Sequence, residues 1–401
     1  AFFPMGSVEG QMIQDLVKEC KRWNEKLQFQ LVDPHRDPIT VKTMNIKMVP
    51  SVLVVCETNR KELFGDEMFQ RPNPMMGNRE PPKFLGEMVI TSAILNVTQG
   101  RRRKVVFSTG HEEPGIRTHT MEGITGLVAY LNKENFEVAE GSLMEGIATD
   151  AAILVLLAPR KALHTTEIKN LKEFVLERKG HLMVAVNPYQ SNPDLEKFFS
   201  EVYGVNMNDE IIINGSQIAQ DPTMLIPSYS PHKIIQSLQE KKIGIVMQMC
   251  RGLSIEERPL WKAVPFLKTA DQTYAKRQKA ELESGKLTFT QGVDANGPFT
   301  VGLAFEGKDA ASGTRAVFFG SSAFLSNKLL QVVGNADLVM NTANWLVGQE
   351  EMLSIRPKSV EFGMVTVPAD AAPRVFFLSV LASPLLIMLV GGVVWWRRRR
   401  V

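Results

Sequence analysis

The chain has 401 residues, 44% hydrophobic and 22% charged, a composition typical of two or three folded domains and not of a disordered protein. Three cysteines are too few for a disulfide scaffold or a four-cysteine zinc site. The net charge of +3 comes from the last 28 residues, which carry five arginines and no acid; residues 1–373 carry 41 Lys and Arg against 43 Asp and Glu, which argues against nucleic acid as a partner.

The first 85 residues are predicted to alternate between helices and strands. Apolar residues at helical spacing predict a helix over 11–27, and Pro38 opens a short second helix. Strands are expected over 29–32 and 52–56. We interpret residues 1–85 as one small domain.

This region resembles the second half of a thioredoxin fold over about sixty residues. Val49-Pro50-Ser51 stands at the place of that family's cis-proline turn. Thioredoxins carry a cysteine pair at the start of their first helix, but residues 3–7 here are FPMGS. Because thiol–disulfide exchange needs a reactive thiolate and a second cysteine, we expect a redox-inactive packing or docking module.

A connecting segment over 86–104 follows. It is predicted to contain an amphipathic helix over 86–97 and a solvated basic linker at 101–104.

Residues 105–349 are predicted to form an α/β sandwich with a doubly wound, mostly parallel sheet. Strands and helices alternate from residue 105, which is typical of parallel sheets covered by helices on both faces. The continuous apolar runs at 151–157 and 181–186 indicate strands buried on both sides. The expected elements are strands at 105–108, 136–139, 211–213, 244–249 and 314–320, helices at 121–133, 165–177, 194–203 and 337–347, and an exposed loop or helix at 269–284.

The first candidate site follows the first strand of this sheet. His111, Glu112 and Glu113 stand there, and ligands of doubly wound folds bind at the carboxyl ends of strands. Histidine and glutamate side chains are suited to acid–base chemistry or to metal binding. Contact with a ligand or partner and a purely structural loop are the alternatives.

The second candidate site is the turn after the strand at 314–320. Gly320-Ser321-Ser322 is a pattern whose backbone N–H groups bind anions in some proteins, so Ser321 and Ser322 are candidate ligand or partner contacts. The alternative is a tight turn with a serine cap. The sequence has neither a G-x-S-x-G elbow nor a phosphate-binding P-loop, and we predict no catalytic residue, metal or cofactor.

The end of the chain carries the strongest signal. Residues 375–396 are 22 residues without a charge, long enough as a helix, at roughly 33 Å, to cross a bilayer core of about 30 Å. The predicted anchor includes interfacial tryptophans, small residues that permit close helix contact, a tolerated proline and a basic tail. Its marker residues are Val375, Pro384, Gly391, Gly392, Trp395, Trp396, Arg397, Arg398, Arg399 and Arg400.

The arginines predict the orientation of this segment. Positive charge stays on the cytoplasmic side, so residues 397–401 are expected in the cytoplasm and the bulk of the chain outside the inner membrane, joined by a stalk over 350–374. Export of such a body needs a signal, and the sequence starts at Ala1 without one. We expect an N-terminal signal or membrane helix to precede it.

Seven short motifs follow one another in a specific order along nearly the whole chain. They are Val32-Asp33-Pro34 to Asp37-Pro38, Gly86-Glu87 to Ile94, Val105 to Glu113, Leu154 to Pro159, Ala316 to Asn327, Asn341 to Gly348, and Ile355 to Lys358. In this order they resemble the GldG-type auxiliary component of the gliding-motility-type ABC transport system. The chain departs from the pattern of that family at Ala323, where the family usually has an acidic residue.

The resemblance implies a non-catalytic, membrane-anchored subunit that works with a separate ABC permease and ATPase on an extracytoplasmic cargo. The α/β region also resembles a class I glutamine amidotransferase sandwich, but neither elbow candidate, Ala158-Pro159-Arg160 or Asn187-Pro188-Tyr189, carries the nucleophilic cysteine. The alternatives are an anchored hydrolase that uses His111, Glu112 and Glu113, and a structural motility or adhesion protein without transporter partners.

Overall fold

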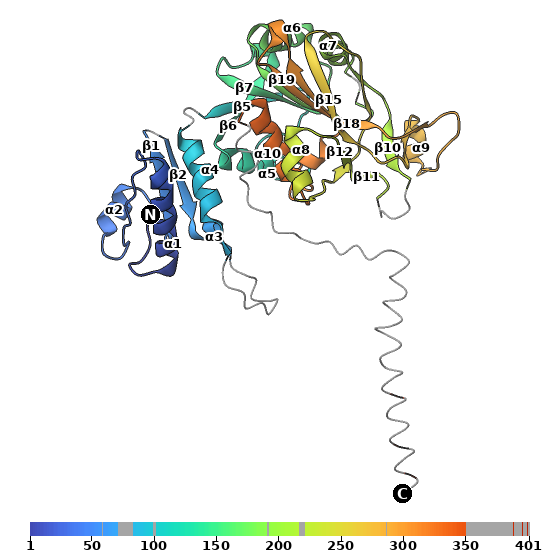
Figure 1. The fold of residues 1–401 in the computed structure, drawn as a ribbon. Helices are drawn as coiled ribbons and strands as arrows, with labels where there is room; N and C mark the ends of the chain where they lie inside the picture. The colour runs from blue at the N-terminus through green and yellow to red at the C-terminus, as the bar shows by residue number, and fades with distance from the viewer. Residues whose placement is uncertain are drawn as a thin grey trace.

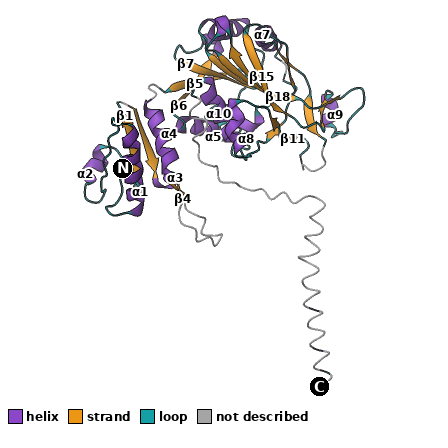
Figure 2. Cartoon of the chain, in the orientation of Figure 1, coloured by secondary structure: helices purple, strands orange, loops and turns teal. Residues whose placement is uncertain are grey.

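A computed structural model describes residues 1–57, 59–70, 83–98, 102–190, 192–215, 221–285 and 287–349, together with Met388, Trp395 and Arg399. The protein is a mixed α/β protein with a large, mostly parallel central sheet (Figures 1 and 2).

The central sheet has eight strands in the order β12-β15-β18-β19-β8-β7-β5-β6. The five strands from β19 to β6 run parallel to their neighbours, and the other three join antiparallel. The strands are β5 (Arg103–Thr109), β6 (Phe136–Ser142), β7 (Ala151–Leu157), β8 (His181–Ala185), β12 (Ser228–Tyr229), β15 (Trp261–Lys268), β18 (Thr300–Gly307) and β19 (Arg315–Phe319).

Helices cover both faces of this sheet. One core includes Val155 and side chains of α5 (Thr125–Lys133), α8 (Lys233–Glu240) and α10 (Asn335–Leu346). The other includes Leu154 and side chains of α6 (Thr165–Lys172), its π-helical extension Glu173–Glu177 and α7 (Pro193–Tyr203). Successive strand residues point to opposite faces, which is why the run at 151–157 is apolar throughout.

A smaller lobe extends from one side of the sheet. Its strands are β10 (Ile211–Asn214), β16 (Thr273–Lys276) and β17 (Ala295–Asn296), next to the short helix α9 (Lys279–Glu283). The remaining short pairs are β9 (Val205–Met207) with β14 (Leu253–Ile255) and β11 (Met224–Leu225) with β13 (Met247–Gln248).

The N-terminal region has its own core around Phe3, Ile13 and Val52. Its elements are α1 (Val8–Trp23), α2 (Pro38–Thr43), β1 (Ser51–Cys56), β2 (Asn59–Phe64), α3 (Gly65–Met68), β3 (Phe69–Gln70), β4 (Lys83–Phe84) and α4 (Gly86–Thr98). Phe2 forms a parallel bridge to Val32 and an antiparallel bridge to Ser51, which joins the start of the chain to the β1–β2 hairpin. The Val49–Pro50 peptide bond is cis.

Most elements predicted between residues 136 and 203 are confirmed within a few residues, and the N-terminal prediction misses β2. Of the strand predicted over 29–32, only the single bridge at Val32 is present. Of the strand predicted over 244–249, only the two residues of β13 are present. The helix predicted from 121 begins at Thr125, because the backbone before it is held by Asn327, whose amide donates to Thr120 O at 2.8 Å.

The prediction of an exposed loop or helix over 269–284 is wrong in its first half. Residues Thr273–Lys276 form β16, and the Lys276 side chain is fully buried. Its ammonium lies 2.8 Å from Asp294 and 2.6 Å from Glu281. Burial opposes its charge, but hydrogen bonds to these carboxylates outweigh that effect and raise the pKa of Lys276.

Within the described residues, no helix combines the length and apolar character needed to cross a membrane. The predicted stalk over 350–374 lies outside those residues, and so does the predicted span over 375–396 apart from Met388 and Trp395.

Candidate functional site at the carboxyl ends of the parallel strands

The switch point of the sheet lies between β5 and β7. The chain passes from β5 to β6 on one side, and then returns to place β7 on the other side of β5. Accordingly α5 and α6 cover opposite faces. In open α/β sheets, this arrangement leaves a crevice at the carboxyl ends of the two strands, where ligands bind. The loop with His111 follows β5, so it stands at this crevice.

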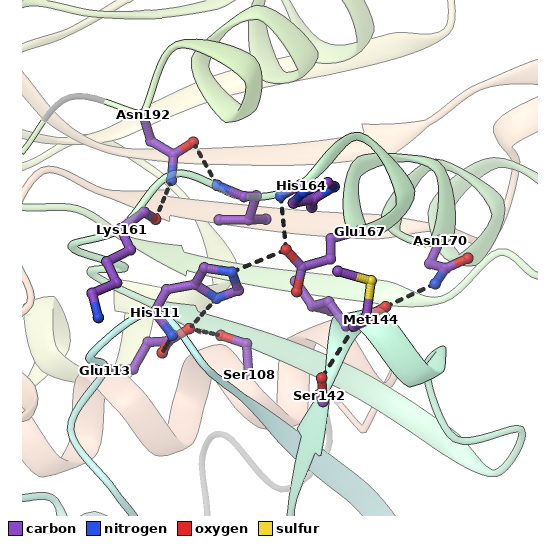
Figure 3. A network of polar contacts seen from close by, with 12 residues as sticks. Ser108, His111, Glu113, Ser142, Met144, Lys161, His164, Glu167, Asn170 and Asn192 are labelled. Carbon is purple, nitrogen blue, oxygen red and sulfur yellow. Dashed lines mark hydrogen bonds and ion pairs between the residues drawn. The ribbon is translucent and has the colours of Figure 1, made fainter.

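His111 is buried between two glutamates in the structure (Figure 3). Its Nε2 lies 3.0 Å from Glu167 Oε2, and its Nδ1 lies 3.4 Å from Glu113 Oε1. The side chains of the two glutamates are only 5% and 2% exposed. The two ring nitrogens lie on different edges of the imidazole, so each of them contacts one of the two carboxylates.

Each carboxylate of this cluster also accepts hydrogen bonds from its own surroundings. Glu113 accepts from the His111 backbone N–H at 2.6 Å and from Ser108 Oγ at 3.0 Å. Glu167 accepts from the His164 backbone N–H at 2.7 Å, a capping contact at the first turn of α6. The two acids therefore hold the histidine and fix the loop after β5 and the start of α6.

The backbone of His111 closes the crevice further. Its carbonyl oxygen accepts hydrogen bonds from Arg160 N at 2.8 Å and Lys161 N at 3.3 Å, both in the loop after β7. In Figure 3 the side chains of Glu113 and Glu167 approach the ring from opposite sides. The loops after β5 and β7 are joined where a ligand of a doubly wound fold would enter.

Glu112 does not join this cluster. Its backbone φ of +62° turns it away from its neighbours, and its side chain is 54% exposed in an ion pair with Lys161 at 3.0 Å. His119 and Glu122, which also stand in this loop, are exposed. The structure thus brings His111 and Glu113 together with Glu167, and it leaves Glu112 on the surface. Glu167 was not predicted, because it lies 56 residues away in sequence.

This geometry bears on what the cluster can do chemically. A general base must reach a substrate proton directly or through one water molecule. Both ring nitrogens of His111 face carboxylates within a buried cluster, so the arrangement suits structural support better than proton transfer to a bound molecule. Within the described residues, no group of three or more His, Cys, Asp or Glu side chains is arranged to hold a metal ion.

The second candidate, the Ser321–Ser322 turn, is also engaged internally. Ser321 Oγ donates to Gln248 O at 2.6 Å and accepts from Ala323 N at 3.1 Å. The backbone N–H and the hydroxyl of Ser322 both donate to Asn187 Oδ1, at 2.8 and 2.9 Å. An anion at this turn would have to displace the Asn187 amide.

Gly320 explains why the turn is tight. A Cβ at this position would lie 2.2 Å from the carbonyl oxygen of Arg251. The backbone N–H of Arg251 donates to Gly320 O at 2.7 Å, so the turn after β19 fixes the Arg251 backbone. Arg251 was not predicted either; the sequence marks it only as an arginine between Cys250 and Gly252.

Two of the cysteines, Cys20 and Cys250, lie in environments that do not favour a thiolate. Cys250 is buried, and burial raises its pKa far above the usual range despite a hydrogen bond with Ser321. Burial and nearby glutamates also raise the pKa of Cys20. The position after β7 that the sequence offers as an elbow is Ala158, at a φ of +46°.

Two of the predicted anchor residues are described. Trp395 is largely exposed, and the guanidinium of Arg399 lies 4.7 Å from the centre of its ring. The other anchor residues lie outside the described part of the chain.

No family model and no curated protein matches the chain. Similar solved structures include the "mmIFT52 N-terminal domain", with a TM-score of 0.46 and 15% identity over 61% of this chain and 97% of that one. A putative ThuA-like protein from Bacteroides uniformis ATCC 8492 has a TM-score of 0.38 and 10% identity. This match covers 62% of this chain and 91% of that one. The exo-beta-1,4-mannosidase Op5Man5 from Opitutaceae bacterium strain TAV5 has a TM-score of 0.32 and 11% identity. This match covers 65% of this chain and 39% of that one. With every TM-score below 0.5, none of the three defines the function of this chain.

Proposed function

We propose that this protein is a non-catalytic, membrane-anchored auxiliary subunit of an ABC transporter complex. Its extracytoplasmic body would bind or couple a cargo to a separate permease and ATPase. The observation that carries the non-catalytic part is the His111 cluster, in which the ring and both acids are buried against one another. The transporter part rests on the order of the sequence motifs and on the apolar segment at 375–396 with its arginines.

The N-terminal region supports a docking role. Its order of bridge, helix, bridge, helix, hairpin and helix is consistent with the proposed thioredoxin-like fold. At the place of the missing cysteine pair, Phe3 is fully buried in the core and Ser7 Oγ accepts from Gly10 N at the start of α1. These residues stabilise the fold, and no thiol stands among them.

Contacts between the N-terminal region and the sandwich are consistent with a coupling role. The Lys61 ammonium donates to the carbonyl oxygen of Lys133, at the end of α5. The Lys133 ammonium pairs with Glu67 at 2.9 Å. Polar contacts of this kind allow two units to shift against each other more readily than a large apolar interface does.

Co-purification tests the proposal. The full chain, tagged and extracted from native membranes with mild detergent, is expected to bring an ATPase and a multi-pass permease with it, identified by mass spectrometry of the intact complex. Recovery from the membrane without these subunits would contradict the transporter role and would favour a structural motility or adhesion protein.

A truncation tests the anchor separately. Deletion of residues 375–401 is expected to release the body from the membrane fraction, because the remaining residues would have lost their lipid-spanning segment. Continued sedimentation of the truncated chain after a high-salt wash and partner removal would show that the anchor lies elsewhere.

A further inference from the structure

The small lobe beside the central sheet contains a buried charged group that belongs to neither candidate site. It consists of Lys276 at the end of β16, Asp294 just before β17 and Glu281 in α9. The side chains of Lys276 and Asp294 are fully buried, and that of Glu281 is 16% exposed. In Figure 1 this lobe extends from the sheet where β10 and α9 are labelled. An amine and two carboxylates are therefore held together away from water.

The pairing of β16 with β17 sets Lys276 opposite Asp294. The last register pair of these antiparallel strands is Ala275 with Ala295, so the next residues along the two chains face each other. Side chains at such positions are near enough to react. Lys276 Nζ lies 2.8 Å from Asp294 Oδ2. Asp294 Cγ is bonded to that oxygen, so Nζ lies within about 4 Å of the carbon that it would attack, close to the near-attack distance of about 3–3.5 Å.

The loop between the two strands folds back over this pair. Lys276 and Tyr274 are two positions apart, so their side chains lie on the same face of β16. The Tyr274 hydroxyl donates to Leu287 O, and its ring meets that of Phe289 edge to face, with the ring centres 5.7 Å apart. Thr290 Oγ1 accepts from Lys276 Nζ at 3.2 Å. These contacts keep water away from the amine and the carboxylate.

The two oxygens of the Asp294 carboxylate have different surroundings. Oδ2 accepts hydrogen bonds from the Thr290 backbone N–H at 2.7 Å and from Lys276. Oδ1 is buried and has no hydrogen-bond partner in the part of the chain that the structure describes. A buried oxygen without a donor is costly, so a reaction that removes Oδ1 relieves this cost. The Thr290 N–H is placed to stabilise negative charge that develops on Oδ2.

We propose that Lys276 and Asp294 form an intramolecular isopeptide bond, with Glu281 as the acid–base catalyst. The ammonium first passes one proton to Asp294, which replaces two buried charges by a neutral amine and a neutral carboxylic acid. Nζ then forms a bond to Cγ. Glu281, 2.6 Å from Nζ, takes a second proton from the nitrogen and delivers it to Oδ1. The Cγ–Oδ1 bond breaks, one water leaves, and the third proton stays on the amide nitrogen.

The raised pKa of Lys276 is compatible with this route. That pKa describes loss of the proton to solvent, whereas the proton crosses a single hydrogen bond to Asp294 in the first step. The product closes residues 276–294 into a covalent ring that fixes β17 to β16. The inference is independent of the transporter role, because it rests only on this lobe.

The central sheet provides an exposed counterpart with the same residue types. Lys104 Nζ lies 2.5 Å from Asp150 and 3.3 Å from Glu137. The side chains of these two acids are 63% and 54% exposed, so water solvates the charges and keeps the ammonium protonated. We expect no bond at Lys104, which makes this group an internal control for proximity without burial.

Peptide mass spectrometry of the full chain, denatured and digested with trypsin, tests the proposal. Trypsin does not cleave after an acylated lysine, so the bond would join peptide 269–277 to peptide 287–308. The joined peptides should be lighter by one water than the two separate peptides, and fragment spectra should place the link between Lys276 and Asp294. Cleavage after Lys104 should be normal.

Three variants separate the chemistry from the fold. Lys276→Arg keeps the positive charge but has no amine to acylate, so only separate peptides are expected. Glu281→Gln cannot accept the proton, and bond formation should slow roughly a hundredfold. Glu137→Gln, the same change beside Lys104, is the matched control and should leave the bond intact. Circular dichroism checks that the variants are folded.

The parent protein alone decides whether the bond exists. The proposal is overturned if the folded parent yields peptides 269–276 and 287–308 at their full masses. Loss of water confined to peptide 287–308 would indicate a succinimide at Asp294 and would also contradict it. A folded Glu281→Gln variant that forms the bond as fast as Glu137→Gln would contradict the role of Glu281.

Discussion

The His111 cluster and the buried side chain of Arg251 both lie at the carboxyl ends of the parallel strands, but their polar groups are matched differently. In the cluster, each ring nitrogen of His111 faces a carboxylate, and the carboxylates accept further donors nearby. The guanidinium of Arg251 instead donates to backbone carbonyl oxygens, those of Asn208 and Met207 at 2.8 and 2.9 Å. Residue type alone therefore does not show whether a buried polar side chain is matched by opposite charges or by the backbone.

The strongest test of the closed cluster is Glu167→Leu. It leaves His111 without its 3.0 Å partner and the His164 N–H without an acceptor. Removing one partner of a buried pair costs about 3–5 kcal/mol, so we expect a loss of that order in the free energy of unfolding, measured by urea denaturation. A loss below about 1 kcal/mol would show that the cluster does not support the fold.

A second histidine, the partly buried His181, sharpens the comparison because it has no carboxylate partner among the residues that the structure describes. His181 accepts from Arg315 N at 3.2 Å, and burial, helped by the charges of Arg315 and Arg103, lowers its pKa to about 4. Between pH 6.5, the pKa of His181 in the unfolded chain, and pH 4, the unfolded chain binds a proton at this histidine and the folded chain does not. The contribution of His181 to stability should therefore fall by up to about 3 kcal/mol between pH 6.5 and pH 4, and change no further below pH 4.

His181→Asn isolates this contribution, because the asparagine amide oxygen can accept the same backbone hydrogen bond. Unfolding free energies at pH 7.5 and pH 4.5 should differ less in the variant than in the parent protein by about 3 kcal/mol. Equal pH dependence in both proteins would mean that His181 is not held neutral.

Gly320→Ala tests how the turn after β19 positions the backbone of Arg251. A Cβ there would lie 2.2 Å from Arg251 O, so the backbone must shift, at a cost of about 1–3 kcal/mol. Gly244→Ala is the control, since the nearest atom to its Cβ is 3.9 Å away. Equal thermal stability of the two variants would contradict the tight contact between Gly320 and Arg251.

The smallest effect is expected for Glu112→Gln. Its exposed ion pair with Lys161 should contribute less than about 1 kcal/mol, since solvent screens such pairs. Urea denaturation of the Glu112→Gln and Glu167→Leu variants under the same conditions compares their losses in the free energy of unfolding directly. A loss as large as that of Glu167→Leu would place Glu112 inside the cluster.

The sequence predicts what depends on local patterns. The apolar run at 151–157 matches β7 residue for residue, and the helix over 165–177 appears as α6 with its π-helical end. Patterns of this kind follow from burial on one or both faces and need no knowledge of distant residues.

The sequence does not predict what depends on pairing across the fold. Glu167 meets His111 over 56 positions, and the burial of Lys276 requires Asp294. Arg251 is stabilised by carbonyl oxygens, which carry no signature in the side-chain pattern. Charged residues are predicted to be exposed unless their partners are known, because unpaired charges are rarely buried. The region around β16 was therefore predicted on the surface.

The accessibility of His111 tests the central claim most directly. Treatment of the full chain with diethylpyrocarbonate, followed by peptide mass spectrometry, compares His111 with the exposed His119 in the same loop. We predict that His111 stays unmodified when His119 is fully modified. Modification of both at similar rates would show that the ring is open to small molecules and would contradict a closed, non-catalytic cluster.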